Sequence, residues 1–224
     1  MDRIIITGAS DGLARQLALK CLENNIKVVA LCRRKPDYEC DFIKTDLSKE
    51  TSIKESCDEI KNRFKKFDAL INCAGVISLQ KVDEITYDEL NNLIAVNSVA
   101  PIFLTSQLMN LIKENHADII NVGSTCGTKA GYEEQLAYTT SKWAIRGTSY
   151  NLQVELKKYN SRVIQLNVGG MNTKFHTKYN GKEIEHPEEW MDPKDIADIM
   201  LYTLNLPKNI EVSEITINRK NVVQ

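Results

Sequence analysis

The stretch RIIITGASDGLA, residues 3–14, decides how the rest of the chain is interpreted. Its first five residues form a short β-branched run, which predicts a buried parallel strand. Gly8 permits a tight turn out of this strand, and Gly12 opens a helix whose apolar residues recur at helical spacing to about Glu23. Such a turn could cradle a phosphate at the N-terminus of the helix. A lone glycine-rich turn is a weak signal, so its meaning depends on the sequence around it.

The same alternation of strand and helix continues to the end of the chain. Further strands are expected over residues 27–32, 41–45, 67–72, 117–122, 162–168 and 211–218. Helices are expected over 48–66 with Ser48 as the cap, from Tyr87 past Pro101 to Glu114, and over 138–159 and 193–204. This order predicts a single α/β domain, residues 1–224, with a Rossmann-type doubly wound parallel sheet of about seven strands and helices on both faces. Ligands of such a sheet bind at the carboxyl ends of its strands.

Charge and composition narrow the classes of function. The 29 basic and 30 acidic residues are interspersed and give a net charge of −1, so we expect no nucleic-acid partner and no membrane partner. The six cysteines lack the spacing of metal ligands, which predicts reduced thiols and no metal site. No signal region precedes the first strand, and no apolar run approaches the roughly 20 residues of a membrane span. A cytoplasmic protein is therefore expected.

A second stretch, AYTTSKWA at residues 137–144, carries the candidate chemistry. Tyr138 and Lys142 are four residues apart, so a helix would present both on one face. A nearby ammonium would favour the phenolate and lower the pKa of Tyr138, which would make the tyrosine a general acid/base. The alternative is a tyrosine and a lysine on a solvated helix face. Ser124, in NVGSTCG after a predicted strand, favours the chemical interpretation, although it could be only a turn residue.

Taken in order, these motifs resemble the short-chain dehydrogenase/reductase family in its compact single-domain form. The resemblance rests on TGASDGLA, NCAG at residues 72–75, Asn97 in VNS, Ser124, and Tyr138 with Lys142. It implies an oxidoreductase that transfers a hydride between a nicotinamide and a carbonyl or secondary alcohol. Tyr138 would be the general acid/base, Ser124 would bind the reacting oxygen, Lys142 would also hold the nicotinamide ribose, and Asn97 would hold a water. Asn97 could instead be a satisfied polar group at a helix kink.

The resemblance also implies a set of cofactor contacts. Asp46 and Leu47 would contact the adenine, and Asn72, Ala74 and Gly75 would lie under the adenine ribose, although NCAG could simply end a strand. Ala14 and Val168 replace a glycine and a proline that are usual in the family. The expected cofactor-binding residues are Gly8, Ser10, Asp11, Gly12, Leu13, Arg33, Arg34, Asp46, Leu47, Asn72, Ala74, Gly75, Tyr138, Lys142, Gly169 and Thr173.

The end of the second predicted strand indicates which dinucleotide is bound. An acidic residue there would accept hydrogen bonds from the ribose hydroxyls of NAD, but the sequence has Cys32 followed by Arg33 and Arg34. A guanidinium offers a planar fork of donors that suits a 2′-phosphate, so NADP(H) is favoured over NAD(H). The arginines could instead be solvated on a surface loop. Asp11 is acidic where some NADP-preferring relatives carry a basic residue.

Two features remain open at the level of sequence. The substrate segment is expected at about Lys174 to Asp192, with Phe175, His176, Tyr179 and Trp190 as candidate pocket residues, and it does not name a substrate beyond a small carbonyl or alcohol compound. Relatives pair through two helices, so the resemblance implies a homodimer or homotetramer. A non-catalytic protein that senses a dinucleotide or binds a partner is the alternative function.

Overall fold

The computed structural model describes residues 1–175, 177, 184 and 187–220 of the chain. A seven-stranded sheet, parallel throughout, runs through the molecule in the order β3-β2-β1-β4-β5-β6-β7. The strands are β1 Arg3–Thr7, β2 Lys27–Cys32, β3 Asp41–Lys44, β4 Ala69–Asn72, β5 Asp118–Val122, β6 Val163–Val168 and β7 Glu214–Ile217. The predicted Rossmann-type sheet is confirmed, and the last strand is shorter than expected.

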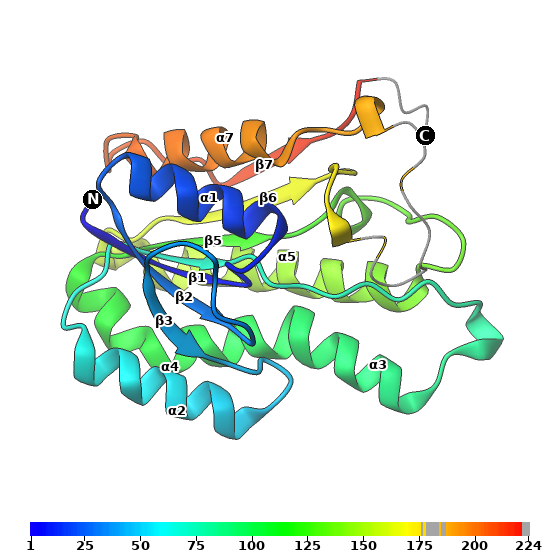
Figure 1. The fold of residues 1–224 in the computed structure, drawn as a ribbon, viewed down its shortest axis with the longest axis horizontal. Coiled ribbons are helices and arrows are strands. Elements are labelled where there is room, and N and C mark those ends of the chain that lie inside the picture. Colours follow the sequence, from blue (N-terminus) through cyan, green and yellow to red (C-terminus); the bar gives the residue numbers. More distant parts are fainter. Residues whose placement is uncertain (176, 178–183, 185–186, 221–224) are drawn as a thin grey trace.

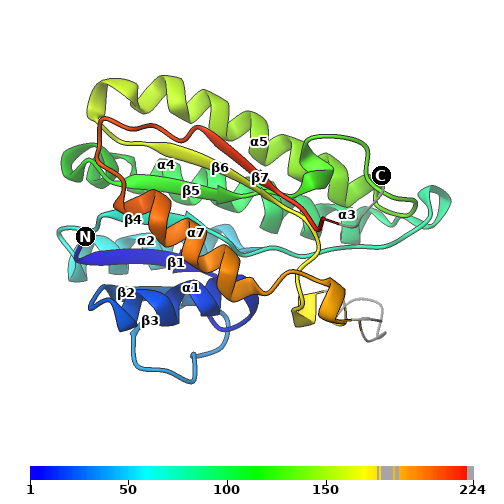
Figure 2. The ribbon, with the colours of Figure 1, turned by 90° about the horizontal axis from the view of Figure 1, so that it is seen from above.

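Helices cover both faces of this sheet (Figures 1 and 2). One face carries α1 and α7, and the other carries α2, α4 and α5. The helices are α1 Gly12–Glu23, α2 Glu50–Arg63, α3 Tyr87–Ile94, α4 Ala100–Asn115, α5 Leu136–Leu156 and α7 Pro193–Asn205. The side chain of Ser48 does not cap α2 as predicted, because the cap position is Lys49 and the Ser48 hydroxyl donates to Asp46 instead.

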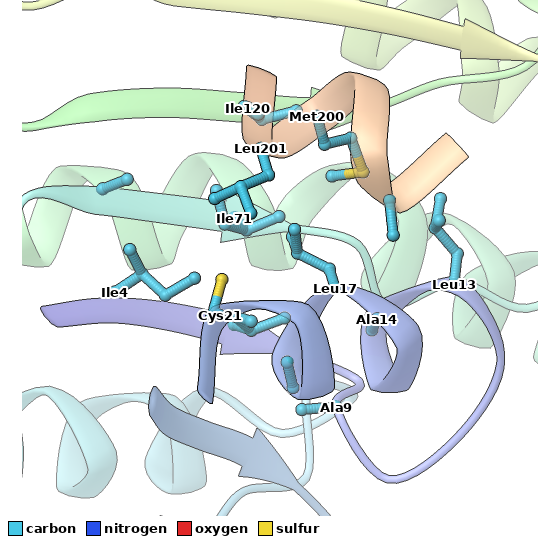
Figure 3. Close-up of a cluster of buried hydrophobic side chains, with 14 of the residues drawn as sticks. Ile4, Ala9, Leu13, Ala14, Leu17, Cys21, Ile71, Ile120, Met200 and Leu201 are labelled. Atoms are coloured by element: carbon cyan, nitrogen blue, oxygen red, sulfur yellow. The ribbon is translucent and has the colours of Figure 1, made fainter. Parts of the chain in front are cut away.

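Two apolar cores form because successive strand residues point to opposite faces of the sheet. Ile4 and Ile6 belong to the core under α1 and α7, whereas Ile5 belongs to the core under α2 and α4. Figure 3 shows Leu13, Leu17 and Cys21 of α1 packed against the sheet and against Met200 and Leu201 of α7. The β-branched runs of the sequence are thus buried on both faces, as a parallel sheet requires.

The helix expected from Tyr87 past Pro101 to Glu114 is continuous in the structure. A π-helical turn, Ala95–Val99, joins α3 directly to α4. The resulting helix, Tyr87–Asn115, has 29 residues and is the one described helix that is long and apolar enough to cross a membrane. The α4 part packs Leu104, Leu108 and Ile112 into the core of the sheet.

A buried ion pair ties the amino ends of two central strands to α7. Arg162, just before β6, donates to Asp118 at the start of β5 with a distance of 2.7 Å from Nη2 to Oδ2. Both side chains are about 95% buried, with 5% and 4% exposed. The same guanidinium donates to the carbonyl oxygens of Leu204 and Leu206, at 3.0 Å in each case. Arg162 therefore satisfies the orphan carbonyls at the end of α7.

We expect Arg162→Met to lower the free energy of unfolding by about 2–3 kcal/mol, because it removes the cation at Oδ2 of the buried Asp118 carboxylate and leaves the partly exposed Lys208, 2.6 Å from Oδ1, as the remaining described cation. Urea denaturation measures this change. Lys54→Met is the matched control, since its ion pair with Glu50 is exposed and should contribute less than about 1 kcal/mol. The double variant Asp118→Leu/Arg162→Met should lose less than the sum of the single losses, and strict additivity would contradict this account.

Because all seven strands are parallel, their carboxyl ends lie at one edge of the sheet (Figure 1). The strand order reverses between β1 and β4, since β2 follows β1 on one side and β4 pairs with it on the other. This is the switch point at which open α/β sheets form a crevice for a ligand. The turns after β1 and β4 therefore frame the candidate site.

Candidate functional site

A cavity of about 380 Å³ lies along the carboxyl ends of the strands. Its volume is within the usual range for a small-molecule site. Every predicted site residue lines it except Asn72 and Asn97: the lining includes Gly8, Ser10, Asp11, Gly12, Leu13, Arg33, Arg34, Asp46, Leu47, Ala74, Gly75, Ser124, Tyr138, Lys142, Gly169 and Thr173. Residues from six separate turns and from α5 are thus brought to one hollow.

The turn after β1 has the geometry that its glycines predict. Gly8 has a φ of +76°, and a Cβ on it would lie 3.0 Å from the Cα of Ala74, so only glycine fits. Thr7, which the sequence analysis did not single out, accepts hydrogen bonds from the backbone N–H groups of Cys73 and Ala74 at 3.0 Å. This threonine joins the turn after β1 to the turn after β4. Asp11 caps α1 by accepting from the N–H of Gly12 at 2.7 Å.

The loop after β2 is held against the turn after β1. The hydroxyl of Tyr38 donates to the carbonyl of Ala9 at 2.7 Å. Arg15 of α1 donates to both carboxylate oxygens of Asp37, at 3.1 and 3.0 Å. The Asp37 carboxylate is thus paired with Arg15. The exposed side chains of Arg33 and Arg34 line the cavity. The cavity therefore has a positively charged end beside β2.

Asn72, which is expected to lie under the adenine ribose, does not line the cavity. It is 4% exposed, and its Nδ2 donates to Oδ1 of Asn121 at 2.8 Å, beneath the cavity. The chain of hydrogen bonds continues through buried side chains of α5 and β6 to the carboxylate of β7: Asn121, Ser149, Gln165, Asn167 and Glu214. A buried polar group needs such partners. The side chain of Asn72 thus supports the sheet, and the cavity is formed by the residues after it.

Ser124 and Tyr138 meet at the end of β5. The Ser124 Oγ accepts from the N–H of Cys126 at 3.2 Å and also hydrogen-bonds with the Tyr138 side chain. Tyr138 is on the first turn of α5, which begins at Leu136, and it is 8% exposed. Its ring centroid is 6.3 Å from that of Phe175. The serine and the tyrosine could therefore act on the same substrate oxygen.

Lys142 lies one helical turn further along α5. Its Nζ is 5.6 Å from the centroid of the Tyr138 ring and donates to the carbonyl of Val122 at 3.1 Å. Burial raises the pKa of Tyr138 above its ordinary value, and the hydrogen bond with Ser124 opposes this only in part. The pKa of Tyr138 in the ligand-free protein is thus raised and not lowered as expected, because the effect of burial dominates. Burial also lowers the pKa of Lys142, from 10.5 to about 8.

Lys142→Met should stabilise the ligand-free fold at pH 7, because wild type buries a charged ammonium. The difference between the folded pKa of about 8 and the unfolded pKa of 10.5 predicts a gain on the order of 3 kcal/mol. Between about 8 and 10.5 the folded wild type releases the Lys142 proton before the unfolded chain does, so wild-type stability rises relative to the variant. Urea denaturation at pH 7 and pH 10 measures both effects, with exposed Lys65→Met as the control. A difference in the free energy of unfolding between variant and wild type that is the same at pH 7 and pH 10 would contradict the account.

Asn97 lies in the π-helical turn and does not line the cavity. Its side chain makes two hydrogen bonds with the backbone of Val76, accepting from N–H at 2.8 Å and donating to the carbonyl at 2.7 Å. Its Nδ2 also donates to Ser141 Oγ at 3.1 Å. Single π turns are frequent at functional sites. Here the turn holds the segment after Gly75 against α5, next to Lys142.

Several residues of the cavity were missed by sequence reasoning. Asn218 and Arg219 follow β7 and line the cavity together with Gly170, Met171 and Trp190. The strand order could have predicted the positions of Asn218 and Arg219, because residues after the last parallel strand must also lie at the carboxyl edge. Phe175 and Trp190, expected as pocket residues, do line the cavity, whereas His176 and Tyr179 are outside the described residues. The described residues hold no group of three or more metal-ligating side chains.

Known proteins resemble this chain in both sequence and fold. Residues 2–184 match the family model described as short chain dehydrogenase. An uncharacterised oxidoreductase of Staphylococcus aureus (strain MRSA252) is 26% identical over 228 residues, which cover 96% of each chain. A 4-hydroxyisoleucine dehydrogenase complexed with NADH is 25% identical, covers 98% of each chain and superposes with a TM-score of 0.87. An alcohol dehydrogenase from the archaeon Thermococcus sibiricus, complexed with 5-hydroxy-NADP, shares the fold at 21% identity, 100% and 99% coverage and a TM-score of 0.89.

The matched region includes the glycine-rich turn, the NCAG turn and the first helical turns of α5. It therefore contains every residue of the Ser124, Tyr138 and Lys142 group. The chain belongs to the short-chain dehydrogenase family and is an NAD(P)-dependent oxidoreductase of that family.

Proposed function

We propose that the protein is an NADP(H)-dependent oxidoreductase that interconverts a small carbonyl compound and the corresponding secondary or primary alcohol. The observation that carries the proposal is the convergence of Ser124, Tyr138 and Lys142 in the cavity that the glycine-rich turn also lines. A hydrogen-bonded serine and tyrosine beside a buried lysine form a proton-transfer group. The 4-hydroxyisoleucine dehydrogenase, similar over its whole length, is named for an alcohol oxidation of this kind.

The glycine-rich turn fits a dinucleotide. Gly8 leaves no room for a side chain beside Ala74, and Gly12 has open space at the N-terminus of α1, where the nearest atoms to a Cβ would be those of Thr173 at 3.9 Å. A pyrophosphate would lie at such a helix N-terminus. The carboxylate of Asp11 now receives the N–H of Gly12, so this cap would have to turn away from an incoming anion. Gly75 and Lys142 would hold the sugar nearer the reacting ring.

The preference for NADP(H) rests on the charge beside β2. Cys32 ends the strand, is buried, and cannot accept hydrogen bonds from ribose hydroxyls as a carboxylate would. Arg33 and Arg34 line the same part of the cavity and present guanidinium donors to a 2′-phosphate. The loop carboxylate of Asp37 is paired with Arg15. A 2′-phosphate would therefore be attracted, and the extra carboxylate that binds NAD would be lacking.

Each side chain of the site has a separate role in the proposed reaction. When bound, the nicotinamide donates or accepts the hydride. Tyr138 gives its phenolic proton to the carbonyl oxygen as charge develops there, and Ser124 donates a hydrogen bond to the same oxygen. The raised pKa of Tyr138 keeps the phenol protonated at neutral pH, which is the form that carbonyl reduction needs. Lys142, charged below about pH 8, stabilises the phenolate that remains. Asn97 keeps the backbone beside this lysine in place.

The proposal is tested by mixing the protein with NADPH and a panel of ketones and aldehydes and by following NADPH oxidation and alcohol formation together. Equal amounts of oxidised cofactor and alcohol would support it. Binding of NADPH without turnover of any carbonyl or alcohol would favour a dinucleotide-sensing role. Comparable turnover with NADH and NADPH at the same concentrations would refute the cofactor preference.

A further inference from the structure

One arginine of the cavity wall has no role in the proposed reaction. Arg219 follows β7 and lines the cavity together with Trp190 and Gly170. Its guanidinium carbon lies 4.4 Å from the centroid of the Trp190 ring, so the cation lies over the indole in a cation–π contact.

Part of this guanidinium has no hydrogen-bond partner. The Nε of Arg219 is buried, and no atom of the described residues accepts its hydrogen. A buried donor left unsatisfied costs free energy, and in native proteins such a group is an exception that needs an explanation. The indole ring of Trp190 offers this Nε–H no acceptor atom, because its one polar group is an N–H donor. Because Arg219 also lines the cavity, an anion bound there would lie within reach of its guanidinium.

The arginine approaches the backbone next to Gly169, which is expected to flank the nicotinamide. A Cβ on Gly170 would lie 2.7 Å from the Trp190 ring and 3.4 Å from the Nε of Arg219. Glycine at 170 thus allows the indole and the guanidinium to approach the turn after β6. The other cations of the described cavity wall have different places: Arg33 and Arg34 lie beside β2, and Lys142 lies beside Tyr138.

We propose that Arg219 binds the carboxylate of the substrate, so that the protein reduces oxo acids to hydroxy acids and oxidises hydroxy acids in the reverse direction. The inference rests on the proposed function and names its substrate class. A carboxylate matches the planar fork of a guanidinium and can accept two parallel hydrogen bonds. In the reduction, the hydride of NADPH bonds to the carbonyl carbon, the C=O π bond breaks, and the proton of Tyr138 bonds to the oxygen. The carboxylate at Arg219 is unchanged by this step.

The test compares acids with their neutral esters in wild type and in Arg219→Met. The panel is 2-oxobutanoate, 3-oxobutanoate and 4-oxopentanoate, each paired with its methyl ester, because these acids differ in the distance from carbonyl to carboxylate. For the best acid we expect kcat/KM to exceed that of its ester by at least about 30-fold, and Arg219→Met should remove most of this ratio through KM. Methionine retains apolar packing on Trp190. Lys220→Met, an adjacent exposed cation outside the cavity, is the control for net charge.

A second readout separates this inference from the proposed function. Butanoate should raise the thermal stability of the protein–NADPH complex more than butanamide does, and this difference should be absent in Arg219→Met. If no carbonyl is reduced, the proposed function fails, and the butanoate measurement still decides the inference. Turnover of esters as efficient as that of acids, or equal stabilisation by butanoate and butanamide, would overturn it. A weaker affinity of Arg219→Met for NADPH, with the acid preference intact, would also overturn it by assigning Arg219 to the cofactor.

Discussion

Tyr138→Phe should lower kcat for carbonyl reduction by about 1,000-fold, because it removes the proton donor and leaves the surrounding cavity in place. The phenol is buried and hydrogen-bonded with Ser124, so its loss deprives the reacting oxygen of one of its two donors. Phenylalanine preserves the ring that packs near Phe175. The dissociation constant for NADPH, measured by nicotinamide fluorescence, should change by no more than about threefold.

The control for this variant is Tyr202→Phe, which removes the same hydroxyl from an exposed position on α7 that is 68% accessible. It should retain wild-type turnover. A Tyr138→Phe variant that binds NADPH normally and also reduces carbonyls at the full rate would show that the tyrosine is not the acid/base. Loss of NADPH binding together with loss of turnover would instead indicate a structural role.

Arg33→Ala should weaken NADPH binding by about 100-fold while changing NADH binding by less than about threefold. The guanidinium is exposed at the cavity, and a bound 2′-phosphate would receive charge-assisted hydrogen bonds from it. NADH has no 2′-phosphate, so the variant removes nothing that NADH uses. Titrations of nicotinamide fluorescence at low and high salt measure both cofactors, and the NADPH effect should be smaller at high salt because of screening.

Lys35→Ala is the matched control for Arg33→Ala. Lys35 is the next cation of the same loop, is exposed, and does not line the cavity. It should have little effect on either cofactor. Equal weakening of NADPH binding in Lys35→Ala and Arg33→Ala would mean that net charge, and not a specific contact, sets the preference. Unchanged NADPH affinity in Arg33→Ala would contradict the assignment.

Periodicity and turn residues were sufficient to predict the sheet. Short β-branched runs such as Arg3–Thr7 are typical of a parallel sheet that is covered on both faces, and the structure has all seven of the expected strands. Because parallel strands end at one edge, the sequence also predicted that Gly8, Ser124 and Tyr138 would meet in one hollow. At these positions the residue types and the strand order indicate the same site.

The errors arose where a property depends on the surroundings of a side chain. The spacing of Tyr138 and Lys142 predicted their common face, but the pKa of each is governed by burial, which spacing does not report. Asn72 ends β4 next to the cavity, yet its amide reaches Asn121 on the adjacent strand. The position of Arg219 at the carboxyl edge could have been predicted from the strand order, but its approach to Gly170 depends on the pairing of β7 with β6, two segments far apart in the chain.

The central claim is hydride transfer, and isotope labelling tests it most directly. The protein is incubated with NADPH that carries deuterium on the transferred face of C4 and with the best carbonyl substrate of the panel, and the alcohol is analysed by mass spectrometry. The account predicts one deuterium on the carbinol carbon for each NADPH oxidised in wild type and no product above background with Tyr138→Phe. An alcohol without deuterium on that carbon, or NADPH oxidation with no alcohol formed, would contradict it.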